Sequence, residues 1–288
     1  MKKIFVLGSI NTDLVIKTPY IPVKGETIMG SDFFIAHGGK GANQAVAIAR
    51  SKGNVLMCGC VGDDLFGQEA LKSLEKEGVN IEHIKVIKGV PSGIAMITVC
   101  DGDNRIILDS GANAKIDEKQ VDDFLMTANE GDIFLTQLEN PIEIIGYALK
   151  RAKEKGMLVV LNPAPANQDV EKYLQYVDVL TPNEGECTLL GGEEKLKAIV
   201  RTLIVTLGDK GFAIVEKNNK VIYPCIKIKP IDTTAAGDTF VGAMLAKYGE
   251  TNDLVKSAVY GSLAASISCT RKGAQPSIPT KEEVENYQ

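Results

Sequence analysis

Residues 132–161 read DIFLTQLENPIEIIGYALKRAKEKGMLVVL. The apolar runs at 132–136 and 157–161 have the length of buried strands, and the segment 141–154 between them carries apolar residues at helical spacing. Pro141 suits the first turn of that helix. A strand, a helix and a second strand in this order form the repeating unit of an open α/β sheet.

The same alternation continues on both sides of this unit. Upstream it includes a strand at 4–7, a strand in VLMCGCVG and a helix at about 65–77. Downstream we expect strands at 177–180 and 203–206, a helix ending near residue 190, and helices at 235–247 and 252–268. The charged segment before residue 203 is not assigned to an element. We therefore predict a single α/β domain over residues 1–288, with a doubly wound, mostly parallel sheet flanked by helices.

Two segments interrupt this pattern. In 14–36, polar and apolar residues alternate without a helical period, and Pro19, Pro22 and Gly25 act as breakers. Residues 92–99 alternate again, before the run RIIL. We predict that these segments form one small antiparallel sheet, a lid, with its strands within 12–36 and 91–110.

The composition favours a small-molecule partner. The chain has 288 residues, 44% of them hydrophobic and 24% charged, and a net charge of −5, which argues against a nucleic-acid binder. No stretch has the length of a signal-peptide core or a membrane span, so we expect a cytoplasmic protein with no membrane partner. Six cysteines without a CxxC, beside two histidines, argue against a zinc site and predict reduced core thiols.

The stretch DTTAAGDTF at 232–240 leads into a helix whose buried face would include Phe240 and Val241. Backbone N–H groups at a helix start have no intrahelical partner, and small residues leave them open to a phosphoryl group. Asp238 would repel that group unless it takes part in the chemistry, for instance as the base for an attacking hydroxyl. The alternative is an acid that only complements the helix dipole. This stretch alone does not decide between the two.

A second glycine-rich helix start lies at 37–50, HGGKGANQAVAIAR. It has no GxxxxGK[ST] frame, and Gln44 occupies the place of the last glycine in GxGxxG, so it is neither a P-loop nor a dinucleotide fingerprint. Its glycines permit close approach to polar ligand atoms. We interpret His37 as a packing residue.

Polar residues follow several predicted strands, at the edge where open α/β sheets bind ligands. Asn11, Asp13, Asn43 and Glu139 suit a polyol, although each alone also suits a cap or a turn, and Lys40 alone suits a surface charge. Asn183 and Glu186 suit Mg²⁺ or its waters, or, for Asn183, a helix cap. The TLGDKG segment at 206–211 suits a nucleotide or a plain turn.

Taken together, the motifs resemble the ribokinase family of carbohydrate kinases. The resemblance runs essentially end to end, and its segments occur in the family's order: GSINTDLV, GETIMG, GGKGANQAVA, VGDDLFG, LNPAPA, TPNE, VTLGDKG, DTTAAGDTFVGA and TRKGAQPSIP. It implies ATP-dependent phosphorylation of D-ribose at its primary hydroxyl, with Mg²⁺ accompanying ATP, K⁺ as an activator, and a homodimer formed through the lid. The motifs also leave open a sibling kinase for deoxyribose, fructose or a nucleoside, and a non-catalytic sugar sensor.

The resemblance assigns roles to individual positions. Asp238 would be the base, and Ala235, Ala236 and Gly237 would form the anion hole with it. The sugar would be held by Asn11, Asp13, Gly39, Lys40, Asn43 and Glu139, together with Asp238. ATP would contact Asn183, Thr206, Gly208, Gly211, Gly237 and Ser262. Glu186, with Asn183, would serve Mg²⁺, and K⁺ would lie among Asp232, Thr234, Ser268, Arg271, Gly273 and Ser277.

One departure from the family pattern stands out. The connection between Glu186 and Leu203 is short, as though part of a helix were missing. Its position next to the proposed nucleotide residues implies an effect on local packing and on ATP affinity.

Overall fold

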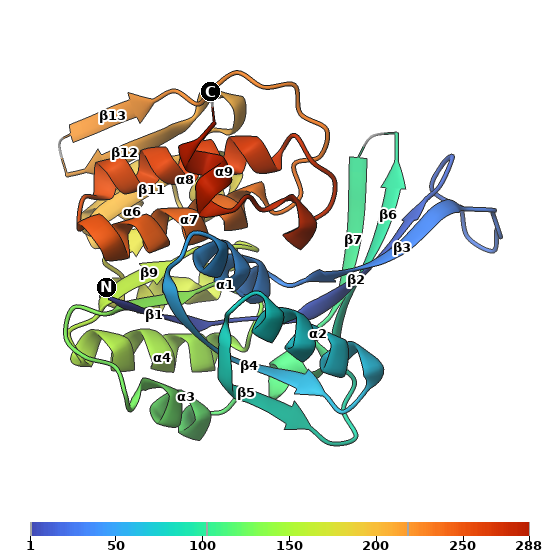
Figure 1. Ribbon diagram of the computed structural model, residues 1–288, viewed down its shortest axis with the longest axis horizontal. Helices are drawn as coiled ribbons and strands as arrows, with labels where there is room; N and C mark the ends of the chain where they lie inside the picture. Colours follow the sequence, from blue (N-terminus) through green and yellow to red (C-terminus); the bar gives the residue numbers. More distant parts are fainter. Residues whose placement is uncertain (1, 102, 218, 288) are drawn as a thin grey trace.

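The computed structural model describes residues 2–101, 103–217 and 219–287. It has a large α/β body and a smaller sheet that projects from one side (Figure 1). In the body, the strands lie in the order β13-β12-β11-β10-β9-β8-β1-β4-β5. Their bounds are β1 Lys3–Leu7, β4 Asn54–Gly62, β5 Asn80–Ile87, β8 Ile133–Thr136, β9 Leu158–Leu161, β10 Val179–Leu180, β11 Thr202–Thr206, β12 Phe212–Glu216 and β13 Asn219–Tyr223.

All neighbours from β11 to β5 pair in parallel, and only the β11–β12 and β12–β13 pairs are antiparallel. The predicted mostly parallel sheet is therefore confirmed. Its central strands are buried on both faces, as a parallel sheet covered by helices requires, whereas the edge strands β5 and β13 are exposed or half-buried. In β1, Ile4 and Val6 face one hydrophobic core, whereas Phe5 and Leu7 face the other.

Helices cover both faces of the sheet. One core contains side chains from α1 Lys40–Arg50, α2 Leu65–Lys76, α7 Ala236–Thr251 and α8 Leu254–Ser268. The other contains side chains from α3 Glu118–Leu125, α4 Ile142–Glu154, α5 Glu184–Leu189 and α6 Glu193–Ile199. The short α9 Lys281–Glu285 packs against α8. The sheet is thus doubly wound, as predicted.

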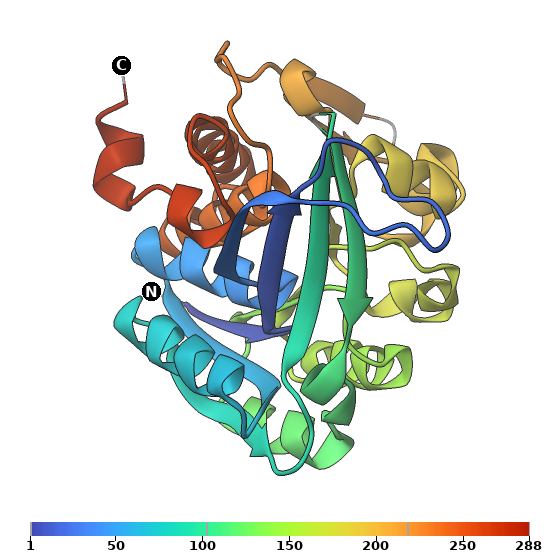
Figure 2. The same ribbon diagram turned by 90° about the vertical axis from the view of Figure 1, so that its right-hand side faces the viewer.

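The lid sheet has the strand order β3-β2-β6-β7. Its strands are β2 Asn11–Lys17, β3 Ser31–Gly38, β6 Gly93–Cys100 and β7 Asp103–Asp109. The β2–β3 and β6–β7 pairs are antiparallel, but β2 and β6 pair in parallel. Two hairpins that each leave the body with their first strand meet along those first strands, so the lid is mixed rather than wholly antiparallel (Figures 1 and 2).

Several elements differ from the sequence-based expectations. The unassigned charged segment contains α6, whose Leu196 is fully buried, so the short connection is filled by two short helices. Strands β5, β12 and β13 were not predicted, and α7 continues to Thr251 rather than to 247. Pro141 lies at the N-cap of α4, just before its first turn.

The cysteines are less uniform than predicted. All six are free, and Cys58, Cys60, Cys100 and Cys187 are buried. Cys225 and Cys269 are only partly buried, because they lie in loops rather than in a core layer. Among the described residues, no helix is both long enough and apolar enough to cross a lipid bilayer.

Candidate active site

The predicted site residues come from strand ends and helix starts at one edge of the large sheet. Asn11 follows β1, Glu139 follows β8, and Asn183 follows β10, where it pairs with Thr206 of β11 in an isolated parallel bridge. Helices α1 and α7 begin near the same place, as the electrostatic interaction between Lys40 in the first turn of α1 and Asp238 in the first turn of α7 indicates. The carboxyl edge of a parallel sheet is where such folds bind ligands.

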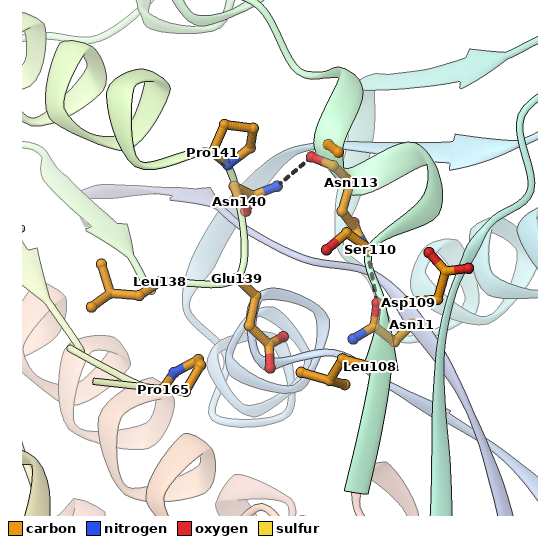
Figure 3. Close-up of a pocket in the computed structure, with 11 residues that line it drawn as sticks. Asn11, Leu108, Asp109, Ser110, Asn113, Leu138, Glu139, Asn140, Pro141 and Pro165 are labelled. Atoms are coloured by element: carbon orange, nitrogen blue, oxygen red, sulfur yellow. Dashed lines mark hydrogen bonds between the residues drawn. The ribbon is translucent and has the colours of Figure 1, made fainter. Parts of the chain in front are cut away.

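Two cavities lie at this edge. The first, of about 350 Å³, lies between the lid and the body and is shown in Figure 3. Asn11 and Glu139 line it, together with Asn140 and Leu108 of β7. The second, of about 200 Å³, is lined by Lys40, Asn162, Asn183, Glu186, Thr206 and the start of α7. The predicted sugar set is therefore divided: Asp13, Gly39 and Asn43 line neither cavity, and Lys40 lines the second.

A network of asparagines fixes the first cavity. Asn113 accepts from the N–H of Ile10 at 2.9 Å and donates to the side-chain oxygen of Asn11 at 2.7 Å. Asn140 donates to the carbonyl of Asn113 at 3.0 Å (Figure 3). Because the Asn11 oxygen is already used, its amide N–H₂ is the group left for a ligand. A Cβ at Gly93 would lie 2.2 Å from the Asn113 amide nitrogen, so this packing requires glycine there.

Asp13 is a buried carboxyl group, with 8% of its surface exposed. Burial, with the nearby carboxylates of Glu139 and Asp238, raises its pKa to about 7, although Lys40 acts in the opposite direction. Its carboxylate packs against Gly38, where a Cβ would lie 2.3 Å from Asp13 Oδ1.

Lys40 is not the surface charge that its sequence context alone suggested. Burial would lower the pKa of its ammonium group, but the carboxylates of Asp238, Glu139, Glu186 and Asp13 outweigh burial and raise it. Glu139 accepts from the Lys40 backbone N–H at 3.3 Å and from the Ser9 hydroxyl. Gly39 has φ +88°, and a Cβ there would lie 2.7 Å from the Asn11 nitrogen. The absence of a Cβ therefore lets the start of α1 lie directly against the backbone that joins β1 to β2.

The predicted cradle is the N-terminus of α7. Ala235 is the N-cap in the left-handed region at φ 59°, and α7 starts at Ala236. The Ala236 N–H already donates to the Thr233 carbonyl at 3.2 Å, which leaves the N–H groups of Gly237 and Asp238 for a ligand. A Cβ at Gly237 would meet no atom within 4 Å, so the first turn of α7 is uncrowded on that side. Ala235, Ala236, Gly237 and Asp238 all line the second cavity.

Asp238 is buried at this helix start, and both of its carboxylate oxygens accept hydrogen bonds. Asn43 donates to Oδ2 at 3.0 Å, and Gln44 donates to Oδ1 at 2.9 Å. Burial raises the pKa of Asp238 above its ordinary value, although Lys40 and these two amides favour the carboxylate. A raised pKa makes the carboxylate a stronger base than a solvated one.

Asn183 and Glu186 form a reciprocal capping box at the start of α5. The Asn183 side chain accepts from the Glu186 N–H at 2.8 Å, and Glu186 accepts from the Asn183 N–H at 2.9 Å. The capping interpretation of Asn183 is therefore correct. Burial raises the pKa of Glu186, against the Asn183 N–H and Lys40. Only Oε2 of Glu186 serves the cap, so its other oxygen is left at the second cavity, an arrangement that fits Mg²⁺ bound chiefly by phosphates and water.

Not all of the other residues that were predicted to contact ATP line this cavity. Thr206 lines it, whereas Gly208, Gly211 and Ser262 do not. The 206–211 segment is a tight turn, because the Leu207 N–H donates to the Gly211 carbonyl at 2.8 Å. Gly211 packs against the Tyr223 carbonyl, from which a Cβ would lie only 2.0 Å away, whereas a Cβ at Gly208 would meet no atom within 4 Å. Ser262 is a buried residue of α8.

The residues predicted for K⁺ come from the loop before α7 and from the end of α8 with the segment that follows it. The Ile231 N–H donates to the Cys269 carbonyl at 2.8 Å, and the Gly273 N–H donates to Asp232 Oδ2 at 2.9 Å. Asp232 also accepts from the Thr234 hydroxyl at 2.6 Å. Burial alone would raise the pKa of Asp232, but these hydrogen bonds outweigh it and lower the pKa.

Within these segments, the hydroxyls of Ser268 and Ser277 donate to backbone carbonyls, and the Arg271 guanidinium pairs with Glu283. Arg271 can therefore offer only its carbonyl to a cation. The segments are rich in oxygen, and the Asp232 carboxylate is anionic, so the donor set fits a monovalent cation.

Several site residues were missed from the sequence. Ser9, Gln44, Asn113, Gln137 and Asn162 are buried polar residues that hydrogen-bond to predicted site residues or to one another. Gln137 and Asn162 directly follow β8 and β9, so the rule that selected Asn11 would also have found them. No comparable signal marks Gln44.

Comparison with known proteins shows which family the chain belongs to. The profile described as "pfkB family carbohydrate kinase" matches residues 1–281. The chain belongs to the pfkB family of carbohydrate kinases. A ribokinase from Haemophilus influenzae is 40% identical over 98% of this chain and 97% of its own length. A deoxyribokinase from Salmonella typhi is 33% identical over 99% of this chain and 98% of its own.

The same similarity extends to solved structures. The structure of Arabidopsis thaliana ribokinase complexed with ribose and ATP superposes on this chain with a TM-score of 0.87 and 28% identity. It covers 99% of this chain, which in turn covers 97% of it. The pfkB fold is thus shared along essentially the whole chain, lid included.

Proposed function

We propose that this protein transfers the γ-phosphoryl group of ATP to the primary hydroxyl of D-ribose, giving D-ribose 5-phosphate and ADP. The observation that carries the proposal is Asp238, a buried carboxylate with a raised pKa at the open N-terminus of α7. Asp238 lines the second cavity together with Lys40, and Lys40 also interacts electrostatically with Asp13 and Glu139 on the sugar side. Family membership and the similarity to ribokinases support the same reaction.

In this reaction Asp238 accepts the proton of the sugar hydroxyl. The hydroxyl oxygen then forms a bond to the γ-phosphorus, and the bond from that phosphorus to the β,γ-bridging oxygen breaks, with its electron pair leaving on ADP. The N–H groups of Gly237 and Asp238 would donate to the transferred group as charge develops on it, and Lys40, which lines the same cavity, would add a positive charge there.

Bound Mg²⁺ would neutralise charge on the phosphates. Glu186 would hold the ion or its waters through the carboxylate oxygen that the capping box leaves free, with Asn183 fixing the position of Glu186. Thr206 borders the same cavity and would contact the nucleotide. Gly208, Gly211 and Ser262 would contribute only beyond this cavity.

The alternative acceptors are deoxyribose, fructose and nucleosides. Similarity to a deoxyribokinase supports the first of them, and a non-catalytic sensor is disfavoured because Gly237 and Asp238 are both in place. A coupled assay of ADP release over a panel of these sugars tests the proposal, with Asp238→Asn as the inactive control. Ribose should give the highest kcat/KM, and a higher value for any other acceptor would overturn this assignment.

We further propose that K⁺ activates the enzyme from the loops that hold Asp232, Thr234 and Gly273. Those loops pack directly before α7, so a cation there would stabilise the start of the cradle. Replacing K⁺ by a bulky organic cation at matched ionic strength should lower kcat. Equal activity in the two salts would remove K⁺ from the proposal.

We also propose that two copies of the chain associate through the lid. Its strands expose large apolar side chains, among them Phe33 at 61%, Ile35 at 55% and Ile107 at 71%. Such a patch is typical of an interface. Light scattering should give a dimer for the unmodified protein and a monomer for Ile107→Asp, and an unmodified monomer would refute this interface.

A further inference from the structure

Two consecutive amides hold Asp238, and they differ in what else they bind. Asn43 uses one N–H on Asp238, and its own carbonyl oxygen is buried without a partner among the described residues. Gln44 is fully buried, and every hydrogen-bonding group of its amide is engaged within the protein. Asn43 is therefore free to contact a ligand, whereas Gln44 has no group left for one.

The surroundings of Gln44 fix which way its amide points. Its nitrogen donates to Asp238 Oδ1 at 2.9 Å and to Asn162 Oδ1 at 3.0 Å, and its oxygen accepts from the Gln137 amide at 2.6 Å. Asn162 in turn donates to the Thr181 carbonyl at 2.8 Å, so its oxygen must face Gln44. A flipped Gln44 amide would place its oxygen against two acceptors and its nitrogen against a donor.

The packing of the two helices makes this contact possible. Gly242 lies one turn after Asp238 in α7, and a Cβ there would lie 2.6 Å from the Gln44 carbonyl and 2.5 Å from the Ala47 Cβ. Gly8 makes room in the same way for Gln137, since a Cβ at Gly8 would lie 2.2 Å from the Gln137 side-chain oxygen. Gly242 thus lets Gln44 approach Asp238, and Gly8 leaves room for the Gln137 side chain that contacts Gln44.

We infer that Gln44 is a positioning residue that keeps the Asp238 carboxylate ionised and oriented toward the acceptor hydroxyl, and that Gln137 fixes the amide of Gln44 in the donating orientation. This inference rests on the proposed role of Asp238 as the base. It differs from a packing role, because an apolar side chain of the same length would fill the space but donate no hydrogen bond. A hydrogen bond to a charged acceptor favours the charged form.

Other charged groups also act on Asp238. Lys40 of α1 favours its carboxylate, whereas Glu139 after β8, Asp13 of β2 and Glu186 of α5 disfavour it. None of these groups bonds to Gln44. A change at Gln44 therefore alters the hydrogen bonding of Asp238 and leaves its charged neighbours in place.

The test measures the titration of Asp238 directly. Aspartate labelled with ¹³C at the carboxyl carbon is followed by NMR against pH in the full chain without substrates, and the Asp238 signal is identified by its loss in Asp238→Asn. In Gln44→Met the midpoint should move up by about one pH unit, the effect of one lost hydrogen bond to a charge. In Gln137→Met it should move in the same direction by less, because Asp238 keeps both direct donors.

Kinetics supply the second measurement. At a pH below the wild-type midpoint, kcat of Gln44→Met should fall about 10-fold and recover as the pH rises, while KM for the sugar changes little. Gln120→Met is the matched control, because Gln120 is a buried glutamine whose amide donates to the Gly59 and His83 carbonyls, away from the site. It should leave both the titration and the pH profile unchanged.

The outcomes separate the alternatives. A wild-type titration in Gln44→Met would show that Gln44 only packs, and would overturn the inference. If Gln44→Met does not fold, Gln137→Met decides instead, and an unshifted midpoint there overturns the inference. Failure of the unmodified protein to phosphorylate any sugar would refute the proposed function, while the NMR titration would still report whether Gln44 controls the ionisation of Asp238.

Discussion

The two sides of Asp238 are built differently. On the sugar side, Asp13 and Asp238 are both buried with raised pKa values, and Glu139 and Lys40 lie close to them. On the nucleotide side, Asn183 is exposed, and it and Glu186 satisfy each other through a capping box. The first region holds buried carboxyl groups that repel one another around a single ammonium group, whereas the second holds two groups that satisfy each other.

This difference indicates where binding energy is used. Buried carboxylates that lie close to one another destabilise the folded protein, and hydrogen bonds donated by sugar hydroxyls would offset part of that cost. The paired groups on the nucleotide side destabilise the folded protein little. A triphosphate would bind there through the open N–H groups of the helix start and through Mg²⁺. Changes on the sugar side should therefore impair catalysis while improving stability, whereas changes on the nucleotide side should lower stability and weaken the use of ATP.

The largest effect is expected for Asp238→Asn. The change removes a buried negative charge and the proton acceptor but keeps an oxygen that can accept a hydrogen bond. If Asp238 is the base, kcat should fall by about 10² to 10⁴ while ATP and ribose still bind. Steady-state kinetics beside a thermal melt measure both quantities. Near-normal turnover with a small loss of stability would instead show that Asp238 only complements the helix dipole.

A smaller effect is expected for Asp13→Asn. If Asp13 accepts hydrogen bonds from the sugar, kcat/KM for ribose should fall by roughly 30- to 150-fold, or about 2 to 3 kcal/mol, with KM for ATP nearly unchanged. The same change should raise the free energy of unfolding at neutral pH, because it removes repulsion from Glu139 and Asp238. Unchanged ribose kinetics would remove Asp13 from the sugar site.

The stability gain should depend on pH in a defined direction. The pKa of Asp13 is about 7 in the folded protein and 3.8 in its unperturbed form. Between these values the folded state keeps a proton that the unfolded state has lost, so this group makes wild-type stability fall as the pH rises from about 4 to about 7. The stability advantage of Asp13→Asn should grow over that window and stay constant above it. Urea titrations at several pH values measure it.

The smallest effect is expected for Asn183→Ala. Loss of the cap on α5 should lower the free energy of unfolding by about 1 kcal/mol and raise KM for ATP, while sugar kinetics stay the same. Thr280→Ala is the matched control, because Thr280 and Glu283 form the same capping box on α9, away from both cavities. That variant should lose similar stability without changing KM for ATP. Equal ATP kinetics in the two variants would place Asn183 outside the nucleotide site.

Many elements of the large α/β body were predictable, because the spacing of apolar residues that marks them can be read within one segment of the sequence. The strands at β1, β8, β9 and β11 and the helices α2 and α4 carry apolar spacing that a single segment displays. Helix α6 escaped because it is short, charged and anchored by the single buried Leu196. Strand β13 was not predicted because its residues are largely exposed, so burial does not impose a pattern of apolar residues on its sequence.

The site was predictable to a similar extent and for a similar reason. Asn11, Glu139 and Asn183 were found because each follows a strand at the ligand edge. The bond between Gln44 and Asp238 joins residues 194 positions apart, and it depends on the glycine at 242 that lets two helices touch. No local pattern encodes such a contact. The parallel β2–β6 pairing was missed on the same grounds, since it joins two separate hairpins.

Strand β2 of the lid starts at Asn11, and Asp13 lies two residues further along it, paired with Ala36 of β3 and Ala95 of β6. Asn11 and Asp13, two of the residues that we assign to the sugar, therefore lie at the base of a sheet whose far end projects from the body (Figure 1). A small rotation of β2 about this base would displace the far end of the lid by more than it displaces the base. A contact that holds the far end in place would therefore also limit the movement of Asn11 and Asp13.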